Sequence, residues 1–247
     1  MEKQEEYILE MQKAGLQYGH KHSRTHPQAK FFILKTQNNS ELINLEETAK
    51  RLDEAKAFIS QIMVEQNQIL FVATTSTIKA NIKELTLKFK QPYVIERWLG
   101  GTLTNFKTIN NRINYLLDLK NKLTSGQMEK YTKKEKLEID KEIKALDSKF
   151  SGLIGFNHLP KALFIIDPML NQIAVKEAKK MKIPVVAVLD TDDDPTLIDY
   201  PIPANDSSRP ALTFILKEIE KAILEGKEKA VLKEKEKEEQ KLTEIKN

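Results

Sequence analysis

Three short apolar runs, rich in β-branched residues, dominate the hydrophobic pattern of the chain. They occupy residues 69–74, 163–166 and 185–189. Each run is nearly continuous rather than alternating, which is typical of strands that are buried on both faces of a parallel sheet. Shorter candidate strands lie at residues 42–45, 93–95 and 200–203.

Between these runs, apolar residues recur with the spacing of amphipathic helices. One face of residues 46–64 carries Leu52, Ala55, Ile59 and Ile62. Residues 77–89, 171–181 and 207–224 also have helical patterns. Alternating strands and helices predict an α/β fold with an open, doubly wound parallel sheet of the flavodoxin or Rossmann type.

Residues 107–150 interrupt this alternation with two helical arms. Their apolar spacing is coiled-coil-like, at Ile109, Ile113, Leu116 and Leu123, and again at Ile139, Ile143, Leu146 and Phe150. Ser125-Gly126 marks a turn between the arms. We expect an inserted coiled-coil hairpin that protrudes and offers a charged surface to a partner, because each arm has few apolar positions. A hairpin folded flat against the sheet fits the periodicity equally well.

These patterns divide the chain into four parts. Residues 1–40 form an N-terminal helix and a basic arm, and residues 41–106 and 151–225 form the α/β domain. Residues 107–150 are the hairpin insert. Residues 226–247 are rich in lysine and glutamate, which predicts a frayed helix or disorder.

Composition narrows the class of protein. The 247 residues are 40% hydrophobic and 31% charged, with no cysteine, which excludes disulfides, thiol catalysis and cysteine-ligated zinc. No apolar run approaches the roughly 20 residues that span a bilayer. The start of the chain is too acidic and polar for a secretory signal. We therefore expect a soluble cytoplasmic protein.

Charge is sorted along the chain, although the net charge is only +4. Residues 11–40 contain five cations and no acid, and Tyr18, Phe31 and Phe32 lie among these cations. Such a segment favours a polyanionic partner. An ordinary solvated surface is the alternative.

The most enzyme-like segment is the apolar run that ends in Asp190-Thr191-Asp192. It is similar to the nucleophile motif of haloacid-dehalogenase-type phosphatases, in which two carboxylates at this spacing hold Mg²⁺. Such enzymes also need a lysine and an acidic pair on later strands, which the chain does not offer. The competing interpretation is a polar turn in which Asp190 bonds backbone amides before Pro195.

Other catalytic and cofactor sites have weaker support. His20, His22 and His26 lack regular metal-ligand spacing, and no glycine follows Thr74 to cradle a phosphate. No nucleophile elbow can be recognised. We predict no catalytic residue, no bound metal and no cofactor.

The most distinctive segment, residues 96–107, holds the only tryptophan, Trp98. The pair Gly100-Gly101 allows a close backbone approach or a sharp turn. Thr104 or Asn105 can cap the helix that follows. Free amides at that helix start, with Arg97 and Lys107 nearby, suit a phosphate, whereas Trp98 is expected to be a core anchor.

Residues 97–108, Arg-Trp-Leu-Gly-Gly-Thr-Leu-Thr-Asn-Phe-Lys-Thr, resemble the signature of bacterial-type ribosomal small-subunit protein two. Further segments agree in the family's order, at 14–20 with Pro27, 43–46, 159–167 with 174–178, and 190–209. The resemblance covers about residues 9–224, nearly everything but the tail.

The resemblance implies a parallel sheet with a protruding coiled-coil hairpin. It also implies a place on the small ribosomal subunit near the head–body junction, contact with ribosomal RNA and neighbouring ribosomal proteins, help in recruiting the mRNA-binding ribosomal protein one, and no catalysis. We expect RNA binding through phosphates and shape rather than base sequence. The candidate RNA-binding residues are Lys13, Lys21, Arg24, Lys30, Arg97, Thr104, Asn105 and Lys107.

Two rival hypotheses come from other classes of protein. One is a Mg²⁺-dependent phosphatase that uses Asp190 and Asp192. The other is a free-standing adaptor whose hairpin binds proteins away from the ribosome.

Overall fold

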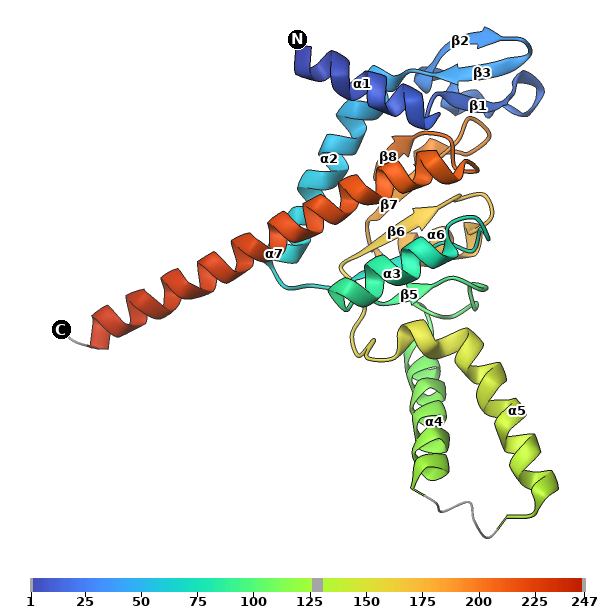
Figure 1. The fold of residues 1–247 in the computed structure, drawn as a ribbon, viewed down its shortest axis with the longest axis vertical. Coiled ribbons are helices and arrows are strands. Elements are labelled where there is room, and N and C mark those ends of the chain that lie inside the picture. Colours follow the sequence, from blue (N-terminus) through green and yellow to red (C-terminus); the bar gives the residue numbers. More distant parts are fainter. Residues whose placement is uncertain (1, 126–130, 246–247) are drawn as a thin grey trace.

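The computed structural model describes residues 2–125 and 131–245. Its centre is a five-stranded sheet in the order β5-β4-β6-β7-β8, in which every neighbouring pair is parallel (Figure 1). The strands are β4 (Ile69–Val72), β5 (Tyr93–Val94), β6 (Ala162–Ile166), β7 (Val185–Leu189) and β8 (Tyr200–Pro203). The predicted parallel α/β sheet is confirmed.

Helices cover both faces of this sheet because successive strand residues point to opposite sides. Ile69 and Phe71 pack into one core with α2 (Leu45–Val64), α3 (Lys79–Phe89) and α7 (Arg209–Ile245). Leu70 and Val72 pack into the other core, with α6 (Gln172–Met181) and the sheet-proximal parts of α4 and α5. Strands β4, β6 and β7 are wholly buried, which explains their continuous apolar sequences.

The N-terminal region forms a second, separate sheet. Helix α1 (Glu2–Ala14) leads into β1 (Tyr18–Lys21), β2 (Ile33–Gln37) and β3 (Ser40–Ile43), which pair antiparallel in the order β1-β3-β2. The candidate strand at residues 42–45 overlaps β3, which pairs with β1 and β2 and not with the parallel sheet. Asn38 and Asn39 connect β2 to β3 with φ of +49° and +61°, as a tight hairpin turn requires.

Helices α4 (Phe106–Thr124) and α5 (Lys133–Phe150) follow β5 and extend away from the sheet (Figure 1). They contact one another through an ion pair between Lys120 and Asp147 and a hydrogen bond from Tyr115 to Glu142. Leu119, not Leu123, is buried on α4, and the side chain predicted at the contact, Leu123, is 49% exposed. The spacing of the first arm was therefore misjudged by one helical turn.

The turn predicted at Ser125-Gly126 lies in the sequence between the end of α4 and the start of α5. Thr132 and Glu135 form a reciprocal capping box that starts α5. Ser125 follows the last residue of α4, whereas Gly126, the other half of the predicted turn, lies outside the described residues.

Helix α7 continues as one helix through Ile245, where the sequence left a frayed helix or disorder open. It crosses α2 closely at Gly226, where a Cβ atom would lie 2.5 Å from the Ser60 carbonyl oxygen. Among the described residues, every helix is too short or too polar to cross a lipid bilayer.

Candidate nucleic-acid interface

The N-terminal sheet is fastened to the carboxyl ends of β7 and β8 by main-chain contacts. The His20 amide donates to the Thr191 hydroxyl at 3.0 Å, and the His26 amide donates to the Thr191 carbonyl at 2.8 Å. The Asn205 amide donates to the Leu16 carbonyl at 3.0 Å. At Gly19 an added Cβ would lie 2.6 Å from Thr191, so only glycine permits this close approach.

One charged pair reinforces this junction. His20 Nδ1 lies 3.0 Å from Asp190 Oδ2 and 3.4 Å from Asp192 Oδ1. The nearby carboxylate of Asp190 outweighs partial burial and raises the pKa of His20 to about 9. The histidine is therefore a cation at neutral pH. Asp190 also accepts a hydrogen bond from the Thr191 amide, as the polar-turn interpretation predicts.

Three further acids, Asp167, Asp193 and Asp206, bring one oxygen each within 4.8 Å of the others. Burial and the neighbouring carboxylates raise the pKa of Asp193 to about 8 and of Asp206 to about 7. Asp193 already accepts hydrogen bonds from the Met169 and Asp190 amides, at 2.8 and 3.0 Å. We assign no metal site to these oxygens, because Asp193 and Asp167 already accept hydrogen bonds from loop amides.

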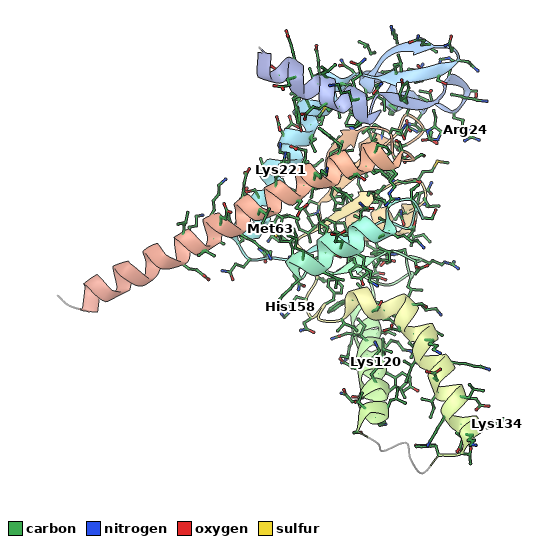
Figure 2. All side chains as sticks on the ribbon, in the orientation of Figure 1. Arg24, Met63, Lys120, Lys134, His158 and Lys221 are labelled. Carbon is green, nitrogen blue, oxygen red and sulfur yellow. The ribbon has the colours of Figure 1, made fainter. Side chains whose placement is uncertain are left out.

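Four candidate RNA-binding residues belong to the N-terminal region, and we call them the arm cations: Lys13, Lys21, Arg24 and Lys30. Lys13 lies in the last turn of α1, and Lys21 ends β1. Arg24 and Lys30 lie in two short 3-10 helices, His22–Arg24 and Pro27–Phe32. All four are exposed, and none forms an ion pair with a described side chain. Figure 2 shows Arg24 in this region, far from Lys120 and Lys134 on the helical pair.

A buried acid, Glu41 on β3, belongs to the same N-terminal region as the arm cations. Its carboxylate is 2% exposed and accepts hydrogen bonds from Thr36 and Thr25, at 2.7 and 3.4 Å. It also contacts His22 Nδ1. All these partners are side-chain groups, so the carboxylate of Glu41 is held by groups that can rotate.

The glycine-pair loop at the other end of the sheet encloses a carboxylate of the same chain. Glu177 on α6 accepts from Trp98 Nε1 at 3.1 Å and from the Gly101 amide at 2.7 Å through Oε1. Its Oε2 accepts from the amides of Leu103 and Thr104, at 3.0 and 3.1 Å, and from the Thr104 hydroxyl at 3.1 Å. Trp98 is 5% exposed, so its predicted role as a core anchor is confirmed.

Thr104 and Asn105, the candidate RNA-binding residues of this loop, form side-chain hydrogen bonds other than the predicted helix cap. Asn105 precedes the first residue of α4, but its side chain makes no capping bond to the backbone and accepts from the Thr108 hydroxyl at 2.8 Å. Thr104 is engaged with Glu177. Asn105 therefore occupies the predicted N-cap position of α4 but forms no side-chain capping bond, and Thr104 does not cap the helix.

Arg97 and Lys107, which we call the root cations, flank this loop. Both are exposed, and neither pairs with an acid among the described side chains. They follow β5 at one end of the strand order, whereas the arm cations lie beside β7 and β8 at the other. The structure therefore forms two separate cationic surfaces, and it brings together no single cluster of all six cations.

Sequence reasoning missed Glu41, Thr191 and Glu177, the residues that hold these surfaces in place. Glu177 carried the clearest signal, because an acid on the buried face of α6, beside Ala174 and Ala178, needs buried donors. The sequence did not indicate that those donors lie more than seventy residues earlier.

Comparison with known proteins adds independent findings. Residues 11–226 match the family model described as ribosomal protein S2. The chain is 42% identical over 214 residues to the small ribosomal subunit protein uS2 of Roseiflexus castenholzii, covering 87% of this chain and 81% of the relative. It is 40% identical over 220 residues to the uS2 protein of Dictyoglomus thermophilum, covering 89% of each.

Proposed function

The chain belongs to the ribosomal protein S2 family, a family of structural and non-enzymatic proteins of the small ribosomal subunit, and from this we propose that it binds small-subunit ribosomal RNA through its arm and root cations. The single observation that carries the proposal is that all six cations are exposed and free of ion pairs with described side chains. Unpaired cations on a fixed backbone are ready to replace the counterions of a phosphate chain.

Both surfaces consist of exposed cations, which supports recognition of phosphates rather than of bases. Folded RNA is bound largely through phosphates, 2′-hydroxyls and shape, because its deep major groove excludes side chains. Thr104 and Asn105 belong to the same proposed surface, since they lie in the loop between Arg97 and Lys107.

The finer placement rests on the family. We place the chain near the head–body junction of a cytoplasmic ribosome, beside other small-subunit proteins, where it helps to recruit the mRNA-binding ribosomal protein one. Helices α4 and α5 would be a protruding coiled coil, inserted as residues 107–150 between the two parts of the α/β domain, 41–106 and 151–225. Residues 1–40 would be the RNA-binding arm, and residues 226–247 a charged tail.

A phosphatase is not supported, because the family is non-enzymatic and Asp190 is engaged by His20 and the Thr191 amide. The adaptor hypothesis makes a different prediction about location. A ribosomal protein travels with small subunits when cell extract is sedimented, whereas a free adaptor stays in the soluble fraction.

Salt titration of binding to small-subunit RNA tests the phosphate contacts. Replacing Lys21, Arg24 and Lys30 by alanine should reduce the slope of log K against log salt by about 2.7, at roughly 0.9 per lost duplex contact. The control replaces Lys83, Lys229 and Lys233, which are exposed cations on α3 and α7, and changes the net charge equally. Equal slopes for the two triple variants would contradict the proposal.

A further inference from the structure

We infer that Glu177 is a positioning residue for RNA binding: its carboxylate holds the loop from Trp98 to Thr104 in the shape that presents Arg97 and Lys107 outward. This inference rests on the proposed function, because it assigns a role to a residue that touches no RNA itself.

The first support is the number and kind of donors. Five donors from a single loop converge on the two oxygens of Glu177, and three of them are main-chain amides. The side chain is buried, with 7% of the residue exposed. Backbone amides that converge in this way form a concave anion site, and here the anion comes from α6.

The second support is electrostatic. Burial alone would raise the pKa of Glu177, but hydrogen bonds from Gly101, Thr104, Trp98 and Leu103 outweigh burial and lower it. Glu177 is therefore a charged group at neutral pH, and hydrogen bonds to a charged acceptor are stronger than those to a neutral one.

The third support is the shape of the loop. Gly101 has a φ of +93°, a left-handed conformation that a side chain would strain, and its amide makes the shortest of the five bonds. Without the carboxylate, the loop would leave its inward amides and the Trp98 indole without a partner. The chain would then favour another conformation.

The root cations lie immediately outside this fixed segment. Arg97 precedes Trp98, and Lys107 lies in the first turn of α4, three residues after Thr104. The direction of both cations therefore depends on the loop that Glu177 holds, and a misplacement of about 1 Å is enough to weaken a positioned contact.

Glu177→Gln is the sharpest variant, because it keeps size and shape. Either orientation of the amide turns an NH₂ group toward at least two of the five donors, so no rotamer restores the bonds. Trp98 is the only tryptophan, so its fluorescence emission reports this loop alone. We expect a red shift in Glu177→Gln and none in Glu84→Gln, which removes the same charge from an exposed position on α3.

A double-mutant cycle in the full chain then tests positioning. In the native background, replacing Arg97 and Lys107 by alanine should reduce the salt slope of RNA binding by about 1.8. Glu177→Gln alone should weaken binding at least about tenfold. In the Glu177→Gln background the same alanine pair should cost little more, since the cations have already lost their geometry.

Other outcomes distinguish a failure of the positioning role of Glu177 from a failure of the proposed RNA binding. An equal loss from the alanine pair in both backgrounds overturns the positioning role and leaves the proposed function intact. No loss from the pair in the native background overturns the root part of the proposed function, and the inference with it. If Glu177→Gln does not fold, Trp98→Phe removes one donor to the same carboxylate and enters the same cycle with the same criteria.

Discussion

Each cationic surface has one buried glutamate in the same part of the fold, but the groups that bind the two acids differ in kind. Glu41 in the arm is bound by side chains of Thr25, Thr36 and His22. Glu177 at the root is bound mainly by loop amides and the Trp98 indole. Side chains can turn to water when the acid is removed, whereas amides of a packed loop cannot. The root should therefore be the more rigid surface and the arm the more adaptable one.

Removing the two acids should have the largest effect and should separate the regions. Glu177→Ala leaves several buried donors without an acceptor, so we expect the free energy of unfolding to fall by about 3 kcal/mol. Glu41→Ala frees donors that can reach solvent, so we expect a loss of about 1 kcal/mol. Urea unfolding of both variants measures the difference. Equal losses would mean that the arm is as tightly held as the root.

A pH titration should distinguish the regions next. The folded pKa of His20 is raised from 6.5 to about 9, so its stabilisation is complete below pH 6.5 and is lost as pH rises to about 9. Raised pKa values of Asp193 and Asp206 act in the same direction. The depressed pKa of Glu177 acts oppositely, because its contribution is lost only as pH falls below 4.5.

The raised pKa of His20 corresponds to a contribution of about 2 kcal/mol to the free energy of unfolding, once the partial exposure of the side chain is discounted. Hydrogen exchange of the β1 amides should therefore accelerate between pH 7 and 9 beyond the intrinsic increase, and exchange of the loop amides should not. His20→Gln should remove most of this extra acceleration. If it persists unchanged in that variant, His20 is not its main source.

Thr191→Val tests the junction between the arm and the large sheet, with a smaller effect. The substitution keeps the shape but removes the hydroxyl that accepts from the His20 amide, so unfolding should become about 1 kcal/mol easier. The salt slope of RNA binding should change little if the main-chain bond from His26 keeps the arm in place. Thermal unfolding and the salt titration check the two statements.

The smallest expected effect is stabilising. Asn39 has a φ of +61° in the turn between β2 and β3, and Asn-Gly is the preferred pair for such a turn. Asn39→Gly should raise the free energy of unfolding by a few tenths of a kcal/mol. A loss of stability in urea would show that the Asn39 side chain contributes more than its backbone conformation costs.

The sequence predicted the fold where burial dominates. Strand β7 and strand β8 have the predicted bounds because continuous apolar runs admit few alternatives. Strands β1 and β2 of the N-terminal sheet were missed because they have four and five residues, none of them buried, so neither period nor hydrophobicity marks them. Short edge strands of this kind depend on their partners rather than on local preference.

The arm cations were proposed from sequence because they lie in a segment without acids, and the root cations because they flank the glycine pair. Their supports were not, since Thr191 and Glu177 meet their partners only after the chain has folded. The pair Gly100-Gly101 indicated a close approach or a sharp turn, but a glycine does not reveal which atom approaches it. Long-range hydrogen bonds are therefore the part of this site that only a structure supplies.

The course of α7 beyond Gly226 has a consequence for packing inside a crowded particle. A helix rises about 1.5 Å per residue, so this section reaches roughly 30 Å past its crossing with α2. It extends away from the sheet as a single rod (Figure 1). A neighbouring molecule on that side would have to leave space for this helix, and the helix would then set a minimum distance between the sheet and that neighbour.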